Sequence, residues 1–447
     1  MSSYLLATIL LAAAPPCGPL DLDTALGLAV TRSDEVAIKQ AELSSAHADE
    51  ALARALRIAP IASATVVTGP SPEARGSVTE SHDSNRSLAG LRPFGRVEVQ
   101  VVQPLYTWGR LDAASEAARA GIDARELLVQ DTTSQVQFRV TQLYWGVSLA
   151  RRLVAVADDV KGALAQADEH IREALAAEDS DISPADRYRV DLFRGVVNGR
   201  TAEAQKGLEL AQVGLAATLG VSAPKLRLKE APLDPPPAEL PDRDAVLAAA
   251  QRQRPDLAAL GDAILARDAE VKAEEAAAKP QFFLAGQFAF SYAPNRDVQL
   301  NPWVHDPFRE LSLGAVLGFR QDLALPTLSA RAHKAMAERA TLERQRVGLG
   351  RLVEVQVDGA LAELKAAHAR HAAAQASLGS GKALFRSTGL DFAAGLVDAK
   401  TIIESYSLYV ESQVSAAQAA YDLVVARARL QQVTGAVPRK GVACELP

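Results

Sequence analysis

Proline placement is the feature that most constrains how this chain can fold. The sequence contains 23 prolines, yet none lies between Pro104 and Pro184 or between Pro326 and Pro438. Proline interrupts a helix because it lacks an N–H donor and clashes with the preceding turn. The two Pro-free stretches therefore predict long helices. A Pro-rich segment at residues 224–241 separates them near the midpoint and predicts a connector.

Apolar residues in the first Pro-free stretch recur at steps of three and four, which is the seam of a helix packed lengthwise on its neighbours. This spacing runs from Leu143 through Val147, Ala150 and Val154 to Leu175. It predicts a helix from about residue 112 to 175, roughly 95 Å long at about 1.5 Å per residue. A helix of that length needs partner helices beside it. The second stretch has a similar spacing, interrupted by glycines.

The segments that precede each Pro-free stretch change to a period of two. Every second residue is valine in 96–101, and the same alternation occurs in 284–292 and 311–320. A strand places alternate residues on opposite faces. The pattern predicts two hairpins with tips at 69–95 and 293–309. The candidates for one continuous apolar face are Val97, Val99, Val101, Leu311, Leu313 and Leu317.

The order of helix, hairpin, long helix, short tip and helix occurs twice, which predicts an internal duplication. The segment from Asp23 to Pro60 parallels the segment from Asp244 to Pro280. The predicted organisation begins with a signal peptide at 1–17 and a first repeat at 18–223, which has its hairpin at 61–107 and its long helices at 112–220. A connector at 224–241 leads to a second repeat at 242–435, which has its hairpin at 280–322 and its long helices at 327–434. A tail at 436–447 follows.

The N-terminus predicts export from the cytoplasm. An apolar run from Leu5 to Ala14 is too short to span a bilayer and is typical of a secretory signal, although no basic residue precedes it. Cys17 follows this run and is a candidate for lipidation. No later segment offers 18 uninterrupted apolar residues, so no helical membrane span is predicted. The net charge of -6 argues against nucleic acid as the main partner.

Strands with one apolar and one polar face suit a wall between lipid and water. Four strands cannot close such a wall, and open edges are not tolerated in lipid, so a membrane protein of this kind must oligomerise. The alternative is a soluble periplasmic coiled-coil scaffold with a small sheet. The residues alone leave both possibilities open. Aromatic residues near the strand ends, where interfacial aromatics belong in a membrane barrel, are Tyr106, Trp108, Phe282, Phe283 and Trp303.

Four segments carry a resemblance to a known family. They are the strand-to-helix junction Val102–Arg110, the first helix from Leu22, the turn Ser183–Asp186 and the turn Gly395–Glu404. Together with the duplicated order, they resemble the TolC-type outer membrane factors from about Leu20 to Gly435. Residues 322–326 depart from the junction pattern of that family.

The resemblance implies a mainly α-helical fold with a transmembrane β part. It implies a homotrimer whose 12 strands close a β-barrel in the outer membrane of a Gram-negative bacterium, with a long α-barrel crossing the periplasm. The chain would be a passive exit duct in a tripartite efflux or type I secretion system, docked by a periplasmic adaptor and an inner-membrane pump. No enzymatic activity and no cofactor are expected.

The resemblance also suggests where charge controls passage. In such channels the helix turns converge at the periplasmic entrance, where rings of carboxylates attract cations and close the duct. Asp186 and Glu404 stand at the acidic positions, and Thr401 stands where the family can carry another Asp. Asp391 and Asp398, on the second tip, are candidates for contact with the adaptor or simply solvate the tip. Asp186 also suits an ordinary structural role, since Ser183 and Pro184 before it form a good helix start.

Other chemical motifs are weak. His368 and His371 share a helix face with Glu363, but no third histidine or cysteine lies near, so a solvated face is favoured over a metal site. Residues 378–383 lack the first glycine and the hydroxyl residue of a phosphate loop. No constellation of nucleophile and base is readable.

Overall fold

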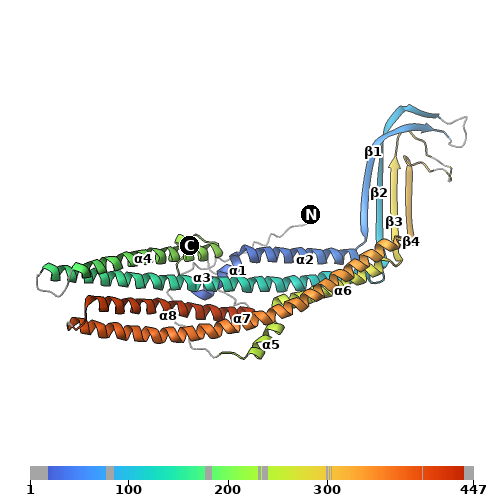
Figure 1. Cartoon of the computed structure of the whole chain (residues 1–447). Coiled ribbons are helices and arrows are strands. Elements are labelled where there is room, and N and C mark those ends of the chain that lie inside the picture. The colour runs from blue at the N-terminus through green and yellow to red at the C-terminus, as the bar shows by residue number, and fades with distance from the viewer. Residues whose placement is uncertain are drawn as a thin grey trace. The chain divides into compact units, whose positions relative to one another are not determined.

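The structure is a computed structural model that describes residues 19–76, 85–176, 184–229, 233, 240–298, 301, 303, 305–394 and 396–436 (Figure 1). The predicted signal peptide, Cys17, Ser183 and the tail beyond 436 lie outside these residues.

The described residues form helices and one four-stranded sheet, which confirms the expected mainly α-helical fold with a β part. The first half contains α1 (Leu22–Arg32), α2 (Asp34–Ile58), β1 (Ile61–Arg75), β2 (Asn85–Tyr106), α3 (Arg110–Ala176) and α4 (Pro184–Thr218). A short 3-10 helix, η1 (Ala223–Lys225), follows. The second half repeats the order with α5 (Arg243–Gln253), α6 (Pro255–Ala277), β3 (Gln281–Tyr292), β4 (Glu310–Arg320), α7 (Leu325–Ala393) and α8 (Ala399–Val433).

The duplication extends to the helix ends. Asp21 caps α1 by accepting from the Thr24 amide at 2.9 Å, and Asp242 caps α5 by accepting from the Ala245 amide at 3.0 Å. A carboxylate at this position satisfies a helix N–H that has no partner within the helix. The two long helices that close the halves are followed by glycines with positive φ, Gly220 and Gly435.

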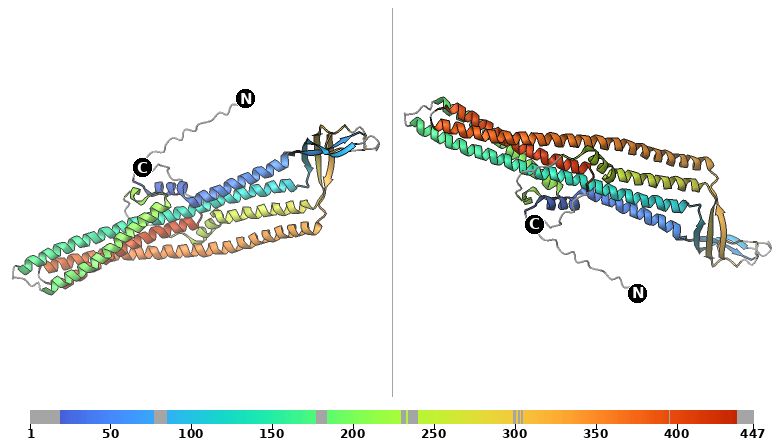
Figure 2. Two further views of the ribbon diagram at one scale, coloured as in Figure 1. Left: turned by 90° about the horizontal axis from the view of Figure 1, so that it is seen from above. Right: turned by 90° about the horizontal axis from the view of Figure 1, so that it is seen from below.

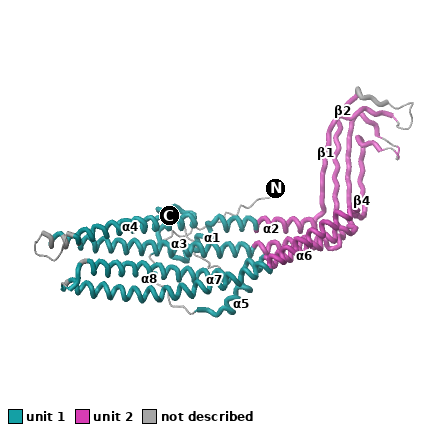
Figure 3. The backbone as a smooth tube through the Cα atoms, viewed as in Figure 1, with its two compact units in different colours: residues 1–42, 126–259, 347–447 teal, residues 43–125, 260–346 magenta. Residues whose placement is uncertain are grey.

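The chain divides into two compact units, and each takes residues from both halves (Figure 3). Unit 1 comprises residues 1–42, 126–259 and 347–447. Unit 2 comprises residues 43–125 and 260–346. The units therefore do not follow the sequence repeats.

Unit 1 contains two equivalent apolar clusters. In the first, Leu28 of α1 packs with Val140 of α3 and Leu215 of α4. In the second, Val246 of α5 packs with Val357 of α7 and residues of α8. Each short helix thus covers the long helices of its own half. The strand-like bridge between Leu20 and Leu228 adds the start of the connector to the first cluster.

The parts of α3, α4, α7 and α8 in unit 1 run side by side (Figure 2). The predicted seam of α3 is buried at Val147, Ala150, Val160 and Leu164, while Val154 is only half-buried. The helices α7 and α8 meet largely through alanines, such as Ala367 and Ala426. Small side chains allow close helix approach, which is consistent with the alanine-rich sequence.

Unit 2 contains the sheet, with strand order β1-β2-β3-β4 and every pair antiparallel. The tip predicted at 293–309 matches the gap between β3 and β4. The tip predicted at 69–95 is too long, because pairing continues to Arg75 and resumes at Asn85. The Gly, Pro and Ser residues there interrupt the alternating pattern in the sequence. Contacts with residues that follow β3 nevertheless hold these parts of β1 and β2 in place.

The junctions from strand to helix differ between the halves. At the first junction Trp108 and Gly109 adopt left-handed φ values of 55° and 80°, and the Trp108 indole donates to the Pro280 carbonyl at 2.7 Å. At the second, Asp322 accepts from the Ala324 amide at 2.9 Å, and Pro326 lies in the first turn of α7. The departure from the family pattern at 322–326 therefore corresponds to a different local turn.

Candidate functional site

The strand register places the predicted apolar residues on one face of the sheet. Val97 and Val99 lie opposite Phe290 and Phe288 of β3, and those phenylalanines lie opposite Leu311 and Leu313 of β4. Residues directly opposite each other in a sheet point to the same side. This apolar face comprises Ala62, Ala64, Val66, Val97, Val99, Val101, Phe282, Leu284, Phe288, Phe290, Leu311, Leu313, Leu317 and Phe319.

Much of the apolar face is open to its surroundings. Leu313 is 84% exposed, and Leu311 and Leu317 are 74% and 73% exposed. Contiguous exposed apolar patches of this kind mark surfaces that contact lipid or another protein. The exposed residues come from β1, β3 and β4, whereas Val97, Val99 and Val101 of β2, between β1 and β3, are half-buried.

The opposite face of the sheet is polar. Arg96 pairs with Glu98 across 3.2 Å, and the Gln287 amide donates to Glu98 at 3.1 Å. Ser63, Thr65 and Gln100 lie on the same side. The sheet therefore has the two-sided character that the sequence predicted, and we call its sides the apolar face and the polar face.

Aromatic side chains gather where the strands meet the helices. Tyr106 and Trp108 pack edge to face with ring centroids 5.0 Å apart, and Phe282 lies 6.2 Å from Phe319. Lys279 lies over the Trp108 ring at 5.5 Å. Aromatic rings with a nearby cation suit an interface between apolar and aqueous surroundings. Trp303, between β3 and β4, is 93% exposed.

The second candidate region lies at the starts of α4 and α8. Val190 of α4 belongs to the same apolar cluster as Ile403 and Tyr406 of α8. The first turns of the two helices are therefore neighbours in unit 1. Asp186 lies one turn before Val190, and Glu404 directly follows Ile403, so their backbones belong to adjacent helix starts. The Asp186 side chain is outside the described part of the structure.

Asp398 and Thr401 form the cap of α8. Asp398 Oδ1 accepts from the Thr401 amide at 2.9 Å and from its hydroxyl at 2.6 Å. The Thr401 hydroxyl and amide together hold the pKa of Asp398 below its usual value, and the positive charge of Arg189 adds to this effect. The Thr401 hydroxyl and amide therefore both bond within the N-terminal cap of α8. Asp398 has a structural role as the cap residue, in addition to any contact with a partner.

Glu404 is exposed and lies 3.7 Å from Lys400, one turn earlier on α8. Exposed pairs of this kind contribute little to stability, so this pair alone assigns Glu404 no structural role. Asp391, near the end of α7, is half-buried, and its carbonyl accepts from the Leu396 amide at 2.9 Å.

The starts of α4 and α8 also carry basic side chains, which the sequence analysis did not include. Asp186, Asp191, Asp398 and Glu404 are matched in number by Arg187, Arg189, Arg194 and Lys400. A charge count of residues 184–194 and 398–404 would have found them. The region is thus balanced in charge and not simply acidic.

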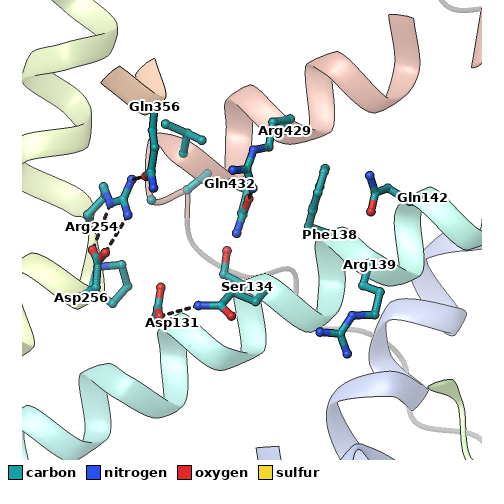
Figure 4. A pocket seen from close by; sticks show the side chains of 15 residues that line it. Asp131, Ser134, Phe138, Arg139, Gln142, Arg254, Asp256, Gln356, Arg429 and Gln432 are labelled. Carbon is teal, nitrogen blue, oxygen red and sulfur yellow. Dashed lines mark hydrogen bonds and ion pairs between the residues drawn. The ribbon is translucent and has the colours of Figure 1, made fainter. Parts of the chain in front are cut away.

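A polar pocket of about 360 Å³ lies in unit 1 between α3 and the helices of the second half (Figure 4). Arg254 makes two bonds to Asp256, at 3.0 and 2.6 Å, and a third to Gln356 of α7 at 2.6 Å. Across the pocket, Asp131 of α3 accepts from Gln135 at 2.8 Å. Burial raises the pKa of Asp131, and the negative charge of Asp256 raises it further. No local sequence pattern predicts this pocket, because its residues come from distant segments.

No set of three or more His, Cys, Asp or Glu side chains is arranged to hold a metal ion in the part of the chain that the structure describes. His371 instead lies 3.4 Å from the Gln375 amide. Among the described helices, none combines the length and apolar character needed to cross a membrane.

Neither a family model nor a curated protein matches the sequence. The structure, however, is similar to solved outer-membrane proteins. The CmeC outer membrane channel of Campylobacter jejuni aligns with a TM-score of 0.76 at 13% identity, covering 94% of this chain and 86% of that one. VceC from Vibrio cholerae aligns with a TM-score of 0.71 at 14% identity, covering 93% and 96%. The open state of the MtrE outer membrane channel of Neisseria gonorrhoeae aligns with a TM-score of 0.71 at 17% identity, covering 94% and 90%.

These alignments cover nearly all of both chains. At such identities they establish the fold. The chain therefore has the TolC-type fold that the sequence analysis expected.

Proposed function

We propose that this chain is a TolC-type outer membrane factor, one subunit of an efflux or type I secretion channel in the outer membrane of a Gram-negative bacterium. The observation that carries the proposal is the exposed apolar face of the sheet, with a polar face behind it, in a chain that has this fold. A soluble protein rarely leaves so large an apolar surface in water. Lipid against the apolar face explains it.

The edges of the sheet support a homotrimer. Among the described strands, β1 pairs only with β2 and β4 only with β3, apart from one bridge between Ala74 near the end of β1 and Arg296. Unpaired strand edges are not tolerated in the hydrocarbon layer. Three copies of the four strands would close a 12-stranded barrel and remove every edge, with the polar face lining the duct.

The proposed role is a passive exit duct. A periplasmic adaptor and an inner-membrane pump would supply the substrate and the energy, and Asp391 and Asp398 at the second tip remain candidates for contact with the adaptor. A signal peptide at 1–17 would direct export. Cleavage before Cys17 would instead leave this cysteine as the mature N-terminus, where lipidation would add an anchor.

We propose Asp186 and Glu404 as candidates for the carboxylates of the periplasmic entrance. In a trimer they would place six carboxylates around one pore. The nearby arginines and Lys400 offset part of this charge, so we expect only a modest preference for cations. Thr401 contributes no charge and stabilises the start of α8.

Conductance across planar lipid bilayers tests this function. Purified full-length protein should produce discrete channels with a modest cation preference. Glu404→Ala should reduce that preference, because it removes three carboxylates from the trimer. Glu411→Ala, on the same helix face two turns further from the proposed entrance, serves as the matched control and should change the selectivity less, because only Glu404 belongs to the proposed ring. A protein that stays soluble without detergent and produces no channels would contradict the proposal and favour the periplasmic scaffold.

A further inference from the structure

The far end of the sheet, away from the helices, is covered on its polar face by the chain itself. Ser71 of β1 and Ala289 of β3 lie on the polar face and are only 0% and 1% exposed. Gln287, two residues nearer the helices on the same face, is exposed. The cover therefore begins at about Ala289.

Two residues that follow β3 build this cover. Asn295 is 5% exposed, accepts from the Ser71 hydroxyl at 2.8 Å and donates to the carbonyls of Ser71 and Gly90 at 2.9 and 2.8 Å. Its side-chain amide thus bonds to both strands of the first hairpin. A buried amide with three good hydrogen bonds fixes its surroundings closely.

Arg296 holds the other side of the cover. Its guanidinium donates to Asp306 at 2.8 Å and to the Pro72 carbonyl at 3.0 Å, and it lies 4.8 Å from the centre of the Phe308 ring. Phe308 packs edge to face on Phe94 of β2 at 4.9 Å. Arg296 and Asp306 are both largely buried. A charge-assisted bond in such a place is stronger than one at an open surface.

The register decides which side these contacts occupy. Phe94 lies opposite Gly69 of β1 and shares the side of Arg96, Glu98 and Gln100, and Ser71 lies on this side as well. Both residues therefore contact the segment after β3 across the polar face. The backbone of Ala74 also bonds to Asn295 and Asp297, at 3.2 and 3.1 Å, which ties the end of β1 to the same segment.

We propose that Asn295 and Arg296 build a second constriction, at the end of the duct farthest from the helices, that limits the size of molecules leaving it. The inference rests on the proposed function, because only in a closed barrel does the polar face line the duct. A cover on the polar face then projects into the lumen, once per subunit. The residues that hold the cover in place become determinants of size selectivity.

Thiol accessibility in outer membranes of cells that express the full chain tests this proposal. A reporter cysteine at Gln287 (Gln287→Cys) lies just inside the cover, and a second at Phe288 (Phe288→Cys) lies on the apolar face. Each is treated from outside with a small methanethiosulfonate and, separately, with a maleimide carrying a polyethylene glycol chain. The protein without a reporter gives the background from its native cysteines, chiefly Cys444.

The small reagent should reach the Gln287→Cys thiol readily and the bulky one slowly. Adding Arg296→Ala or Asn295→Ala should accelerate the bulky reagent about tenfold, which corresponds to about 1.4 kcal/mol, and leave the small one unchanged. Val298→Ala, at an exposed position of the same segment, should change neither rate. If Arg296→Ala fails to assemble, Arg296→Lys replaces it in the experiment. This variant should give an intermediate rate with the bulky reagent, since a lysine keeps the charge but not the geometry.

If Arg296→Ala and Asn295→Ala leave the rate of the bulky reagent unchanged while the small reagent labels normally, the second constriction is overturned. The proposed duct would not be affected by that result. Equal reaction at Gln287→Cys and Phe288→Cys with the small reagent would instead overturn the proposed function.

Discussion

At position 435 the chain requires a residue without a side chain. Gly435 has φ of 72°, and a Cβ atom there would lie 2.7 Å from the Gln253 carbonyl carbon and oxygen. The left-handed conformation alone costs a residue with a side chain about 1 to 2 kcal/mol. The close approach adds to this because a backbone neighbour cannot move aside as a side chain can.

Gly435→Ala should therefore lower the free energy of unfolding by at least about 1 kcal/mol, measured by chemical denaturation in detergent. Gly379→Ala is the control: that glycine is exposed within α7, has nothing within 4 Å of a built Cβ, and should gain about 0.5 to 1 kcal/mol in helix stability. Equal effects of the two changes would show that α8 does not end against α5.

Two aspartates of unit 1 should respond to pH in opposite ways. Burial raises the pKa of Asp131, so its charged form opposes folding. That penalty is absent below the unfolded pKa of about 3.9 and develops as pH rises through the folded pKa. Hydrogen bonds from Arg194 and then Arg172 lower the pKa of Asp168, so its stabilising effect is present above the unfolded pKa and is lost as pH falls through the folded pKa.

Asp131→Asn should then raise the unfolding temperature at pH 7 and have little effect near pH 3. Asp168→Asn should lower that temperature at pH 7, with a difference that shrinks in acid. Thermal unfolding in detergent at several pH values measures both. A destabilising Asp131→Asn at neutral pH would mean that the carboxylate has a cationic partner in the assembled protein.

The role of a single residue could be predicted where its neighbours in the sequence determine that role. The Trp108-Gly109 turn follows from a motif in consecutive residues, and the cap by Asp398 could be predicted from the residues around it, although the sequence analysis assigned Asp398 to the tip surface. Asn295, Arg296 and Asp131 could not be found in this way. Their partners lie far away in the sequence, and no local pattern records a contact that only the folded sheet or bundle brings about.

At the scale of elements, β4 places its leucines on one face of the sheet. Leu311, Leu313 and Leu317 lie on the apolar face, and Ser312 lies on the other. The period of two in the sequence predicted this division, because side chains of a strand alternate by geometry. The period of two did not predict how far β1 and β2 extend, because Gly69 and Pro70 interrupt the alternation of apolar and polar residues.

Leu313→Arg should destabilise the assembled protein by about 2 to 4 kcal/mol if the residue lies near the middle of the bilayer. The control, Ser312→Arg, places the same charge on the polar face one residue away. Folding into liposomes, followed by denaturant titration, measures both. Similar losses for the two substitutions would argue that neither face contacts lipid.

At the scale of the whole molecule, a closed barrel requires more than one copy of the chain. Three copies of 47.3 kDa give about 140 kDa. Light scattering in detergent, corrected for bound detergent, should return this mass or slightly less if the signal peptide is removed. A monomer at working concentrations would leave the edges of β1 and β4 unpaired and would contradict a closed barrel.

Whether the apolar face of the sheet contacts lipid can be measured by probing what surrounds individual residues of β4 in a membrane. Spin labels at Leu311→Cys, Ser312→Cys and Leu313→Cys in liposomes report collision with oxygen, which concentrates in lipid, and with a charged nickel complex, which stays in water. A sheet whose apolar face contacts lipid should show high oxygen and low nickel accessibility at 311 and 313, with the reverse at 312. High nickel accessibility at all three positions would contradict it and place the sheet in water.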